Sequence, residues 1–294
     1  MKPKIVGIGE ILWDLLPSGQ QLGGAPANFA YHARALGARG GVVARVGRDE
    51  SGIEIKRRLE ELGLPLGLLQ EDETAPTGTV AVELSGDGVP HFTIHEGVAW
   101  DRLQPSDAAL QAARGADAIC FGSLAQRSEP SRSTIQGLVD QSRVTALRIF
   151  DVNLRQHFFT REILERSLRL ANVLKLNDTE LPVLADMFDL AGDAAAQLAA
   201  LAGRFELELV ALTRGPQGSL LLQDGRRSEF RPQPVKVMDT VGAGDAFTAA
   251  LAMGLLRKMD LDEINRAANE VARHVCSCAG ATPPLPDSLQ ELFR

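Results

Sequence analysis

The sequence predicts an α/β fold: a mostly parallel central sheet flanked by helices, with a small β lid. Short apolar segments of strand length alternate with helix-length segments along the chain. Of its 294 residues, 45% are hydrophobic, which is enough for a large core, and 23% are charged, as in ordinary globular proteins. No internal repeat, low-complexity tract or linker rich in proline, glycine and serine divides the chain. We therefore expect a single domain over residues 1–294.

The expected strands of the central sheet are short, mainly apolar runs, which is typical of strands covered on both faces. They span residues 5–9, 42–46, 118–121, 147–151, 173–176, 209–213 and 219–222. Helices are expected between several of them, at residues 25–36, 52–62, 161–171 and 194–205. Alternation of this kind builds βαβ units, whose strands run parallel.

Two stretches interrupt the alternation, residues 11–23 and residues 77–97. In the second, residues 79–84 and 91–95 flank a Gly-Asp-Gly turn at 86–88, a pattern that predicts a β-hairpin. An antiparallel insert in a parallel protein suggests a lid over a binding site. A surface hairpin without a role explains the pattern equally well.

Charge and composition exclude several classes of protein. The net charge of −7 argues against a nucleic-acid partner. Three cysteines cannot pair completely, so no disulfide framework is expected, and His274, Cys276 and Cys278 lack the second ligand pair of a zinc site. We interpret the two thiols as buried at a helix end. Neither a signal peptide nor an apolar run of 18 residues is found, so we expect a cytoplasmic protein without a membrane span.

The strongest motif is the glycine-rich segment Asp-Thr-Val-Gly-Ala-Gly-Asp at 239–245, which opens an alanine-rich apolar helix. Glycines allow a tight turn and a close approach to a ligand, and the start of a helix offers free N–H groups. The amides of Gly242, Ala243 and Gly244 are therefore suited to stabilising a phosphoryl group. Asp245 is suited to accept a hydroxyl proton, although it could merely cap the helix.

Two other phosphate-binding motifs are absent. No Gly-Lys pair occurs, so there is no P-loop lysine motif. No Gly-x-Gly-x-x-Gly segment follows the first strand, which disfavours a nicotinamide-dependent oxidoreductase.

The segment at 239–245, followed by Ala246 and Phe247, resembles the C-terminal signature of the ribokinase-like (PfkB) carbohydrate kinases. The Gly-Gly-x-x-x-Asn segment at 23–28 resembles the family's N-terminal signature, and residues 46–52 resemble its Val-Gly-x-Asp-x-x-Gly turn. The resemblance runs from residue 7 to about residue 286. It implies an ATP-dependent sugar kinase that uses Mg²⁺, with Asp245 as the catalytic base and the amides of residues 242–244 as the anion hole.

The resemblance also implies a sugar site. Gly23, Gly24 and Asn28 would bind the sugar, and Asp14 would accept hydrogen bonds from its hydroxyls. Arg155 ends an Asp-x-Asn-x-Arg segment and could pair with a phosphate or an acidic group. Capping or turn chemistry remains open for Asp14 and Asn28, and a surface ion pair remains open for Arg155.

For the phosphate of the nucleotide and the metal ions, the resemblance points to three residues. Asn177 and Glu180 match an Asn-x-x-Glu motif, in which Asn177 would contact phosphate and Glu180 would hold Mg²⁺ through water. The same spacing is equally good helix-capping logic. Asp239, with the loop at 278–281, matches the place where some family members bind K⁺.

Four residues would serve the nucleotide by resemblance. Thr213, Gly215 and Gly218 match a Thr-x-Gly-x-x-Gly loop that cradles the nucleotide, and the alternative is a simple turn between strands. Asn269 would flank the adenosine, or would be an ordinary exposed helix residue.

The motifs look most like those of fructokinases, which predicts phosphorylation of fructose to fructose 6-phosphate. Ribokinase and 2-keto-3-deoxygluconate kinase are the alternatives, followed by a non-catalytic relative that binds sugar or nucleotide. Related enzymes often dimerise through the lid, so a homodimer is expected.

Overall fold

The central sheet contains nine strands in the computed structural model, which describes residues 2–16, 19–84 and 90–294. These are β1 (Lys4–Ile8), β4 (Arg39–Gly47), β5 (Leu69–Asp72), β8 (Ala118–Phe121), β9 (Leu147–Asp151), β10 (Val173–Asn177), β11 (Leu209–Thr213), β12 (Ser219–Gln223) and β13 (Arg226–Phe230). Their order is β13-β12-β11-β10-β9-β8-β1-β4-β5. The pairings of β12 with β11 and with β13 are antiparallel, and the other pairings are parallel. The predicted α/β fold is confirmed.

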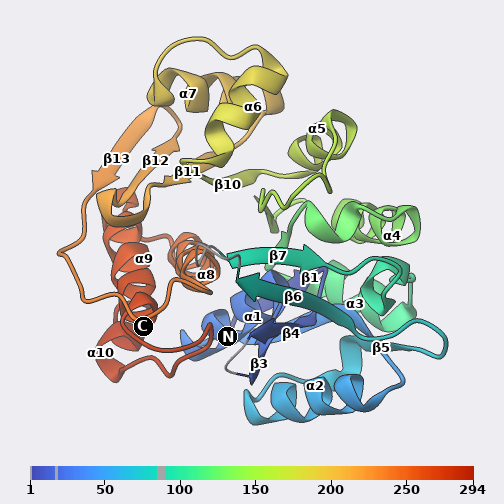
Figure 1. Cartoon of the computed structure of the whole chain (residues 1–294). Coiled ribbons are helices and arrows are strands. Elements are labelled where there is room, and N and C mark those ends of the chain that lie inside the picture. Colours follow the sequence, from blue (N-terminus) through green and yellow to red (C-terminus); the bar gives the residue numbers. More distant parts are fainter. Residues whose placement is uncertain (1, 17–18, 85–89) are drawn as a thin grey trace.

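Helices cover both faces of this sheet (Figure 1). On one face lie α1 (Ala25–Ala35), α2 (Glu50–Glu61), α8 (Ala243–Leu256), α9 (Leu261–Cys276) and the short α10 (Asp287–Glu291). On the other lie α3 (Asp107–Gly115), α4 (Glu129–Asp140), α5 (Arg161–Leu170), α6 (Glu180–Phe188) and α7 (Ala194–Phe205). Successive strand residues point to opposite faces, so Ile5 packs in one core and Val6 in the other.

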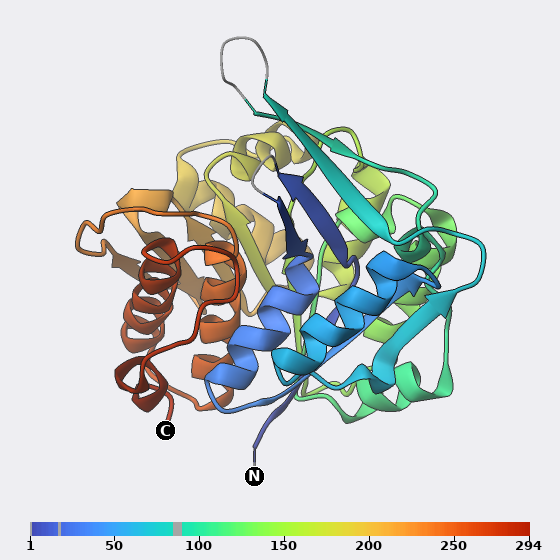
Figure 2. The ribbon, with the colours of Figure 1, turned by 60° about the horizontal axis from the view of Figure 1, so that its bottom comes forward.

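A second sheet is built from two stretches that are far apart in sequence. It has the order β3-β2-β6-β7, with β2 (Leu12–Leu16), β3 (Gly19–Gly23), β6 (Gly78–Leu84) and β7 (Pro90–Ile94). Strand β2 pairs with β6 in parallel, and β6 pairs with β7 antiparallel, as the hairpin prediction requires. The predicted turn at 86–88 lies outside the described residues. Figure 2 shows β6 and β7 projecting at the top of the molecule, while both chain ends lie at the bottom.

The Val-Gly-x-Asp-x-x-Gly turn ties α2 to the start of the hairpin. The Asp49 carboxylate caps α2 by accepting from the Gly52 N–H at 2.7 Å. It also accepts from the Thr77 N–H at 2.8 Å and from the Thr77 hydroxyl at 2.6 Å. A Cβ at Gly52 would lie 2.1 Å from the Gly47 carbonyl oxygen, so the turn requires glycine there.

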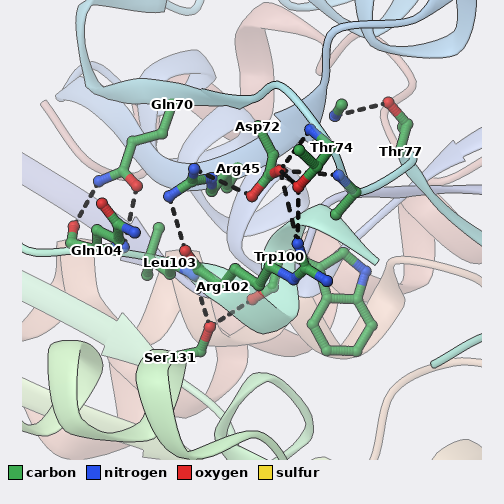
Figure 3. Close-up of polar contacts among 12 residues, drawn as sticks. Arg45, Gln70, Asp72, Thr74, Thr77, Trp100, Arg102, Leu103, Gln104 and Ser131 are labelled. Carbon is green, nitrogen blue, oxygen red and sulfur yellow. Dashed lines mark hydrogen bonds and ion pairs between the residues drawn. The ribbon is translucent and has the colours of Figure 1, made fainter. Parts of the chain in front are cut away.

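A second anchor, drawn in Figure 3, joins β4 and β5 to the 3₁₀ turn η2 (Ala99–Arg102). The buried Asp72 carboxylate pairs with Arg45 at 3.0 Å and accepts from the Thr74 and Ala75 N–H groups at 2.9 and 2.8 Å. Arg45 also donates to the Arg102 carbonyl at 2.8 Å. The backbone donors, with Thr74 and Arg45, outweigh desolvation and lower the pKa of Asp72 to about 2.

Candidate active site

The predicted site residues follow the carboxyl ends of neighbouring strands. Residues 9–14 follow β1, residues 151–155 follow or end β9, Asn177 ends β10 and Thr213 ends β11. In open α/β sheets this edge is where ligands bind. Helices α1 and α8 also begin in predicted motifs, at 23–28 and 239–245, which brings the N-terminal and C-terminal signatures into one region.

The glycine-rich turn starts α8 as predicted. Gly242 is its N-cap residue with φ +78°, and no side chain caps this end of the helix in the described structure. A Cβ at Gly242 would lie 2.5 Å from the Ala281 carbonyl oxygen, so both the left-handed backbone and the close approach require glycine. The start of α8 therefore presents free backbone N–H groups of the kind that suit an anion, and binding of a phosphoryl group there stays a prediction.

Asp245, in the first turn of α8, is held by Asn28 from α1. The Asn28 side-chain amide donates to Asp245 Oδ2 at 2.8 Å, across 217 residues of sequence. Burial, followed by the charge of Asp151, raises the pKa of Asp245 to about 6, against the opposing effects of Asn28, Lys175 and Arg155. A carboxylate with such a pKa is ionised at neutral pH and is close to the optimum for proton transfer.

Beneath the turn lies a buried ion pair that the sequence interpretation missed. Lys175 Nζ pairs with Asp151 Oδ1 at 3.0 Å, and the Thr248 hydroxyl donates to Asp151 Oδ2 at 2.9 Å. A Cβ at Gly244 would lie 3.1 Å from Lys175 Nζ, so the ammonium group sits directly against the anion-binding turn. Burial favours a neutral Lys175, but Asp151 and Glu180 outweigh it and raise its pKa. The site thus holds an ammonium group, paired with Asp151, directly below the N-terminus of α8.

Asn177 and Glu180 form a reciprocal capping arrangement at the start of α6. Asn177 Oδ1 accepts from the Glu180 N–H at 2.9 Å, and Glu180 Oε2 accepts from the Asn177 N–H at 2.8 Å. Glu180 Oε1 accepts from the Leu154 N–H at 3.0 Å, which fixes the loop after β9. Burial raises the pKa of Glu180 despite Lys175. The capping alternative is therefore realised, and binding of phosphate and Mg²⁺ by these two residues stays a prediction.

Carboxyl groups line the part of the site around the Gly-Gly segment. A Cβ at Gly23 would lie 2.5 Å from Asp14 Oδ2, so Asp14 and the Gly-Gly segment are adjacent. Burial raises the pKa of Asp14 and brings that of the buried Glu10, which the sequence interpretation did not select, to about 7. The exposed Arg155 opposes both shifts, and it also opposes the shift at Asp245. Arg155 Nη1 itself donates to the Leu154 carbonyl at 3.0 Å, and a role for Arg155 in binding stays a prediction.

The loop predicted to cradle the nucleotide is a tight turn between β11 and β12. Gly215 and Gly218 have φ +51° and +82°, and the Arg214 N–H donates to the Gly218 carbonyl at 2.7 Å. A Cβ at Gly218 would lie 1.9 Å from the Phe230 carbonyl oxygen. The Thr213 hydroxyl donates to the Leu176 carbonyl at 3.4 Å, which links β11 to β10.

Asn269 is buried on α9, so the alternative of an exposed helix residue is wrong. Its amide donates to the Ser219 hydroxyl at 2.6 Å and to the Asn265 carbonyl at 2.8 Å. Asn265 in turn donates to the Ser228 carbonyl at 3.0 Å. This polar cluster joins α9 to β12 and β13, and contact of Asn269 with adenosine stays a prediction.

The loop after α9 packs against the glycine-rich turn. Asp239 accepts from the Val241 N–H at 3.0 Å and from the Gly280 N–H at 3.1 Å. The Nε2 atom of buried His32, on α1, lies 2.9 Å from the Ala281 carbonyl oxygen, and this hydrogen bond ties the loop to α1. Burial lowers the pKa of His32 to about 4, so the ring is neutral at pH 7 and donates its Nε2 proton. The K⁺ prediction at Asp239 stays untested.

The two thiols near this loop correct one expectation. Cys276 and Cys278 are only partly buried, because α9 ends at Cys276 and exposes its last turn. Among the described residues, no group of three or more histidine, cysteine, aspartate or glutamate side chains is arranged to hold a metal ion. No helix within the described part of the chain is long and apolar enough to span a membrane.

Comparison with known proteins shows similarity over nearly the whole chain. A model of the pfkB family of carbohydrate kinases matches residues 18–288. The chain is 33% identical to a fructokinase of Klebsiella pneumoniae, over 99% of both chains. It superimposes with a TM-score of 0.80 on an uncharacterized sugar kinase of Pyrococcus horikoshii in complex with ATP, at 28% identity over 98% of this chain and 97% of the other. A Vibrio cholerae fructokinase bound to fructose, ADP and calcium gives a TM-score of 0.78 at 25% identity, over 99% of both chains.

Proposed function

Because this chain belongs to the pfkB family of carbohydrate kinases, and is thus a phosphotransferase, we propose that it transfers the γ-phosphoryl group of ATP to fructose, giving fructose 6-phosphate. The hydrogen bond from Asn28 to Asp245 is the observation that carries this proposal. It joins the segment expected to bind the sugar to the carboxylate expected to activate its hydroxyl. Full-length similarity to fructokinases favours fructose as that sugar.

Asn28 has a further property that suits a sugar ligand. Its side chain is buried, and its oxygen Oδ1 has no hydrogen-bond partner among the described residues. A buried acceptor without a donor is unfavourable by about 1–3 kcal/mol. A sugar hydroxyl could supply the missing donor while Asn28 Nδ2 keeps its bond to Asp245, so sugar binding and alignment of the base would use the same side chain.

In the proposed reaction, Asp245 accepts the proton of the sugar hydroxyl as its oxygen forms a bond to the γ-phosphorus. The bond from that phosphorus to the bridging oxygen breaks, and ADP leaves with the electron pair. The backbone N–H groups at the start of α8, backed by the ammonium of Lys175, stabilise the charge on the transferring group. Residues 213–218 and Asn269 cradle the nucleotide.

Mg²⁺ would be held through water by Glu180, whose carboxylate is fixed by two backbone N–H donors, and it would neutralise phosphate charge. The proposal also includes a K⁺ ion bound beside Asp239 and a homodimer that forms through the small sheet. In the same scheme, that sheet acts as a lid that excludes water from the reacting groups.

The charge of the pocket helps to rank the alternative sugars. Asp14, Glu10 and Asp245 are carboxyl groups, and Arg155 is the cation coupled to all three. A substrate with its own carboxylate, such as 2-keto-3-deoxygluconate, would compete with these carboxyl groups for the single cation Arg155. Neutral sugars fit better, so ribose is the main competitor of fructose.

A substrate panel at fixed ATP and Mg²⁺, followed by ADP release, tests the proposal. Fructose should give the highest kcat/KM, above ribose and 2-keto-3-deoxygluconate. Strong turnover of another sugar with little turnover of fructose would disprove the substrate. Activity of Asp245→Asn equal to that of the wild type would disprove the assigned base, and the absence of turnover with every sugar would favour a non-catalytic relative.

A further inference from the structure

Arg127 is a buried arginine that the proposed chemistry does not use. It directly follows the 3₁₀ turn η3 (Leu124–Gln126) at the end of β8, and its side chain is only 5% exposed. Its guanidinium carbon lies 4.0 Å from the centre of the Trp100 ring and 4.5 Å from that of Phe158. Two aromatic rings therefore fix the guanidinium plane through cation–π contacts.

The polar contacts of Arg127 reach the base of the hairpin. Nε and Nη2 pair with the two carboxylate oxygens of Asp101 at 2.7 and 2.9 Å, a bidentate geometry that lysine cannot reproduce. Nη2 also donates to the His95 carbonyl at 2.5 Å, and His95 directly follows β7. Trp100 contacts the other end of the hairpin base, because a Cβ at Gly78, the first residue of β6, would lie 2.2 Å from its indole nitrogen.

Both sides of this cluster lead to the sugar site. The hairpin pairs through β6 with β2, where Asp14 stands opposite Val80. Phe158 belongs to the loop after β9, and its N–H donates to the Arg155 carbonyl at 3.0 Å. Arg127 thus contacts both the hairpin, which pairs with the strand of Asp14, and the loop after β9, which carries Arg155.

We propose that Arg127 is a positioning residue that fixes the hairpin and the loop after β9 relative to each other, and thereby sets the sugar affinity and selectivity of the enzyme. The inference rests on the proposed function, which assigns Asp14 and Arg155 to the sugar. Small displacements of binding groups are costly in enzymes, because reacting and binding geometries tolerate less than about 1 Å of error. A buried bidentate pair between two rings is well suited to hold such a spacing.

Arg127→Lys tests the proposal, since it keeps the charge and removes the planar fork. With the best sugar of the panel, its KM for the sugar should rise about ten-fold or more, while its KM for ATP changes less than about two-fold. Its preference for that sugar over the next best should fall. Hydrogen exchange should accelerate in the segments that carry His95 and Phe158.

Arg45→Lys is the matched control. Arg45 is half-buried, pairs with the carboxylate of Asp72 and donates to the Arg102 carbonyl (Figure 3), and among the described residues it bonds to neither His95 nor Phe158. Because both arginines contact η2, this variant shows whether loosening η2 from β4 and β5 is enough by itself: it should lower the melting temperature without changing the sugar KM or selectivity. Phe158→Leu removes one ring and keeps the ion pair, so it should show a weaker form of the Arg127→Lys effect and replaces that variant if it does not fold.

The outcomes separate the inference from the proposed function. Unchanged exchange in both segments of Arg127→Lys, or of Phe158→Leu in its place, would show that Arg127 does not hold them, whatever the substrate. Faster exchange with an unchanged sugar KM and selectivity would reduce Arg127 to a stabilising residue and overturn the proposal. Turnover of a sugar other than fructose would refute only the assigned substrate.

Discussion

Replacing Asn28 by alanine should move the acid limb of the activity profile to higher pH. The Asn28 amide donates to Asp245 at 2.8 Å and thereby favours the ionised carboxylate, whose pKa is about 6. A hydrogen bond to a charged group contributes about 1.5–3 kcal/mol. Since one pKa unit corresponds to about 1.4 kcal/mol, its loss should raise the pKa of Asp245 by about 1–2 units.

The size of the effect at neutral pH follows from this shift. With a pKa between about 7 and 8, only about a half to a tenth of the enzyme would carry an ionised Asp245 at pH 7. We therefore expect kcat/KM at pH 7 to fall about two- to ten-fold through protonation alone, and this part of the loss should disappear by about pH 9. The sugar KM should be raised at every pH, because Asn28 is also assigned to the sugar.

The assay is kcat/KM for the best sugar from pH 5 to 9.5, with ADP release as the readout. Asn172→Ala is a suitable control, because Asn172 is also buried and its amide donates to the Ala146 carbonyl at 3.1 Å and to Glu208 at 3.3 Å. That variant should melt at a lower temperature and keep the wild-type acid limb. An unshifted limb in Asn28→Ala would refute the electrostatic argument.

Three further perturbations test other parts of the site. The pKa of Asp245 is about 6 in the folded protein and 3.8 for an ordinary aspartate, so the stability of the fold falls as pH rises through this window. Asp245→Asn should therefore lose activity, yet its free energy of unfolding should exceed that of the wild type by up to about 3 kcal/mol at pH 8 and by little at pH 4. Thermal melts with equal gains at both pH values would contradict this. Gly242→Ala should lower kcat at least about ten-fold, because the left-handed φ of +78° is unfavourable for alanine by roughly 1–2 kcal/mol and the added Cβ would strike Ala281. Gly137→Ala in α4 is the control: its Cβ meets nothing within 4 Å, so kcat should stay intact. Glu180→Gln leaves one acceptor oxygen for two N–H donors, so this variant should melt at a lower temperature. It should also need several-fold more Mg²⁺ for half-maximal rate. An unchanged Mg²⁺ dependence would leave Glu180 as a helix cap only.

The sequence predicted the sheet well wherever strands are buried on both faces. Strands β8, β9 and β11 begin and end at the predicted residues, because each is a short apolar run between polar segments. Strands β5 and β13 were missed, and both lie at the edges of the sheet. Strand β13, with the sequence Arg-Arg-Ser-Glu-Phe, has an exposed face and carries no apolar run to recognise.

Within the site, motif residues were easier to predict than the groups that support them. Lys175 interrupts the apolar run of β10, and a lysine inside a buried strand indicates a buried partner, a signal that was available in the sequence. The identity of that partner, Asp151, depends on the pairing of β9 with β10, and the approach of Lys175 to Gly244 depends on the position of α8. Arg127 gave no signal, since its role comes from rings 27 residues before it and 31 after it.

The bond between Asn28 and Asp245 also bears on how the protein is made. Its two ends are separated by 217 residues, and Gly242 additionally rests against Ala281. Chains emerge from the ribosome at about 5–20 residues per second, so more than ten seconds pass between the two halves of the site. During that time the apolar face of α1 lacks α8, its later neighbour in the core. Binding of the substrate therefore cannot stabilise the nascent chain, because the site is still incomplete. Protection against aggregation in this interval must come from chaperones or from the early packing of α1 and α2 on β4.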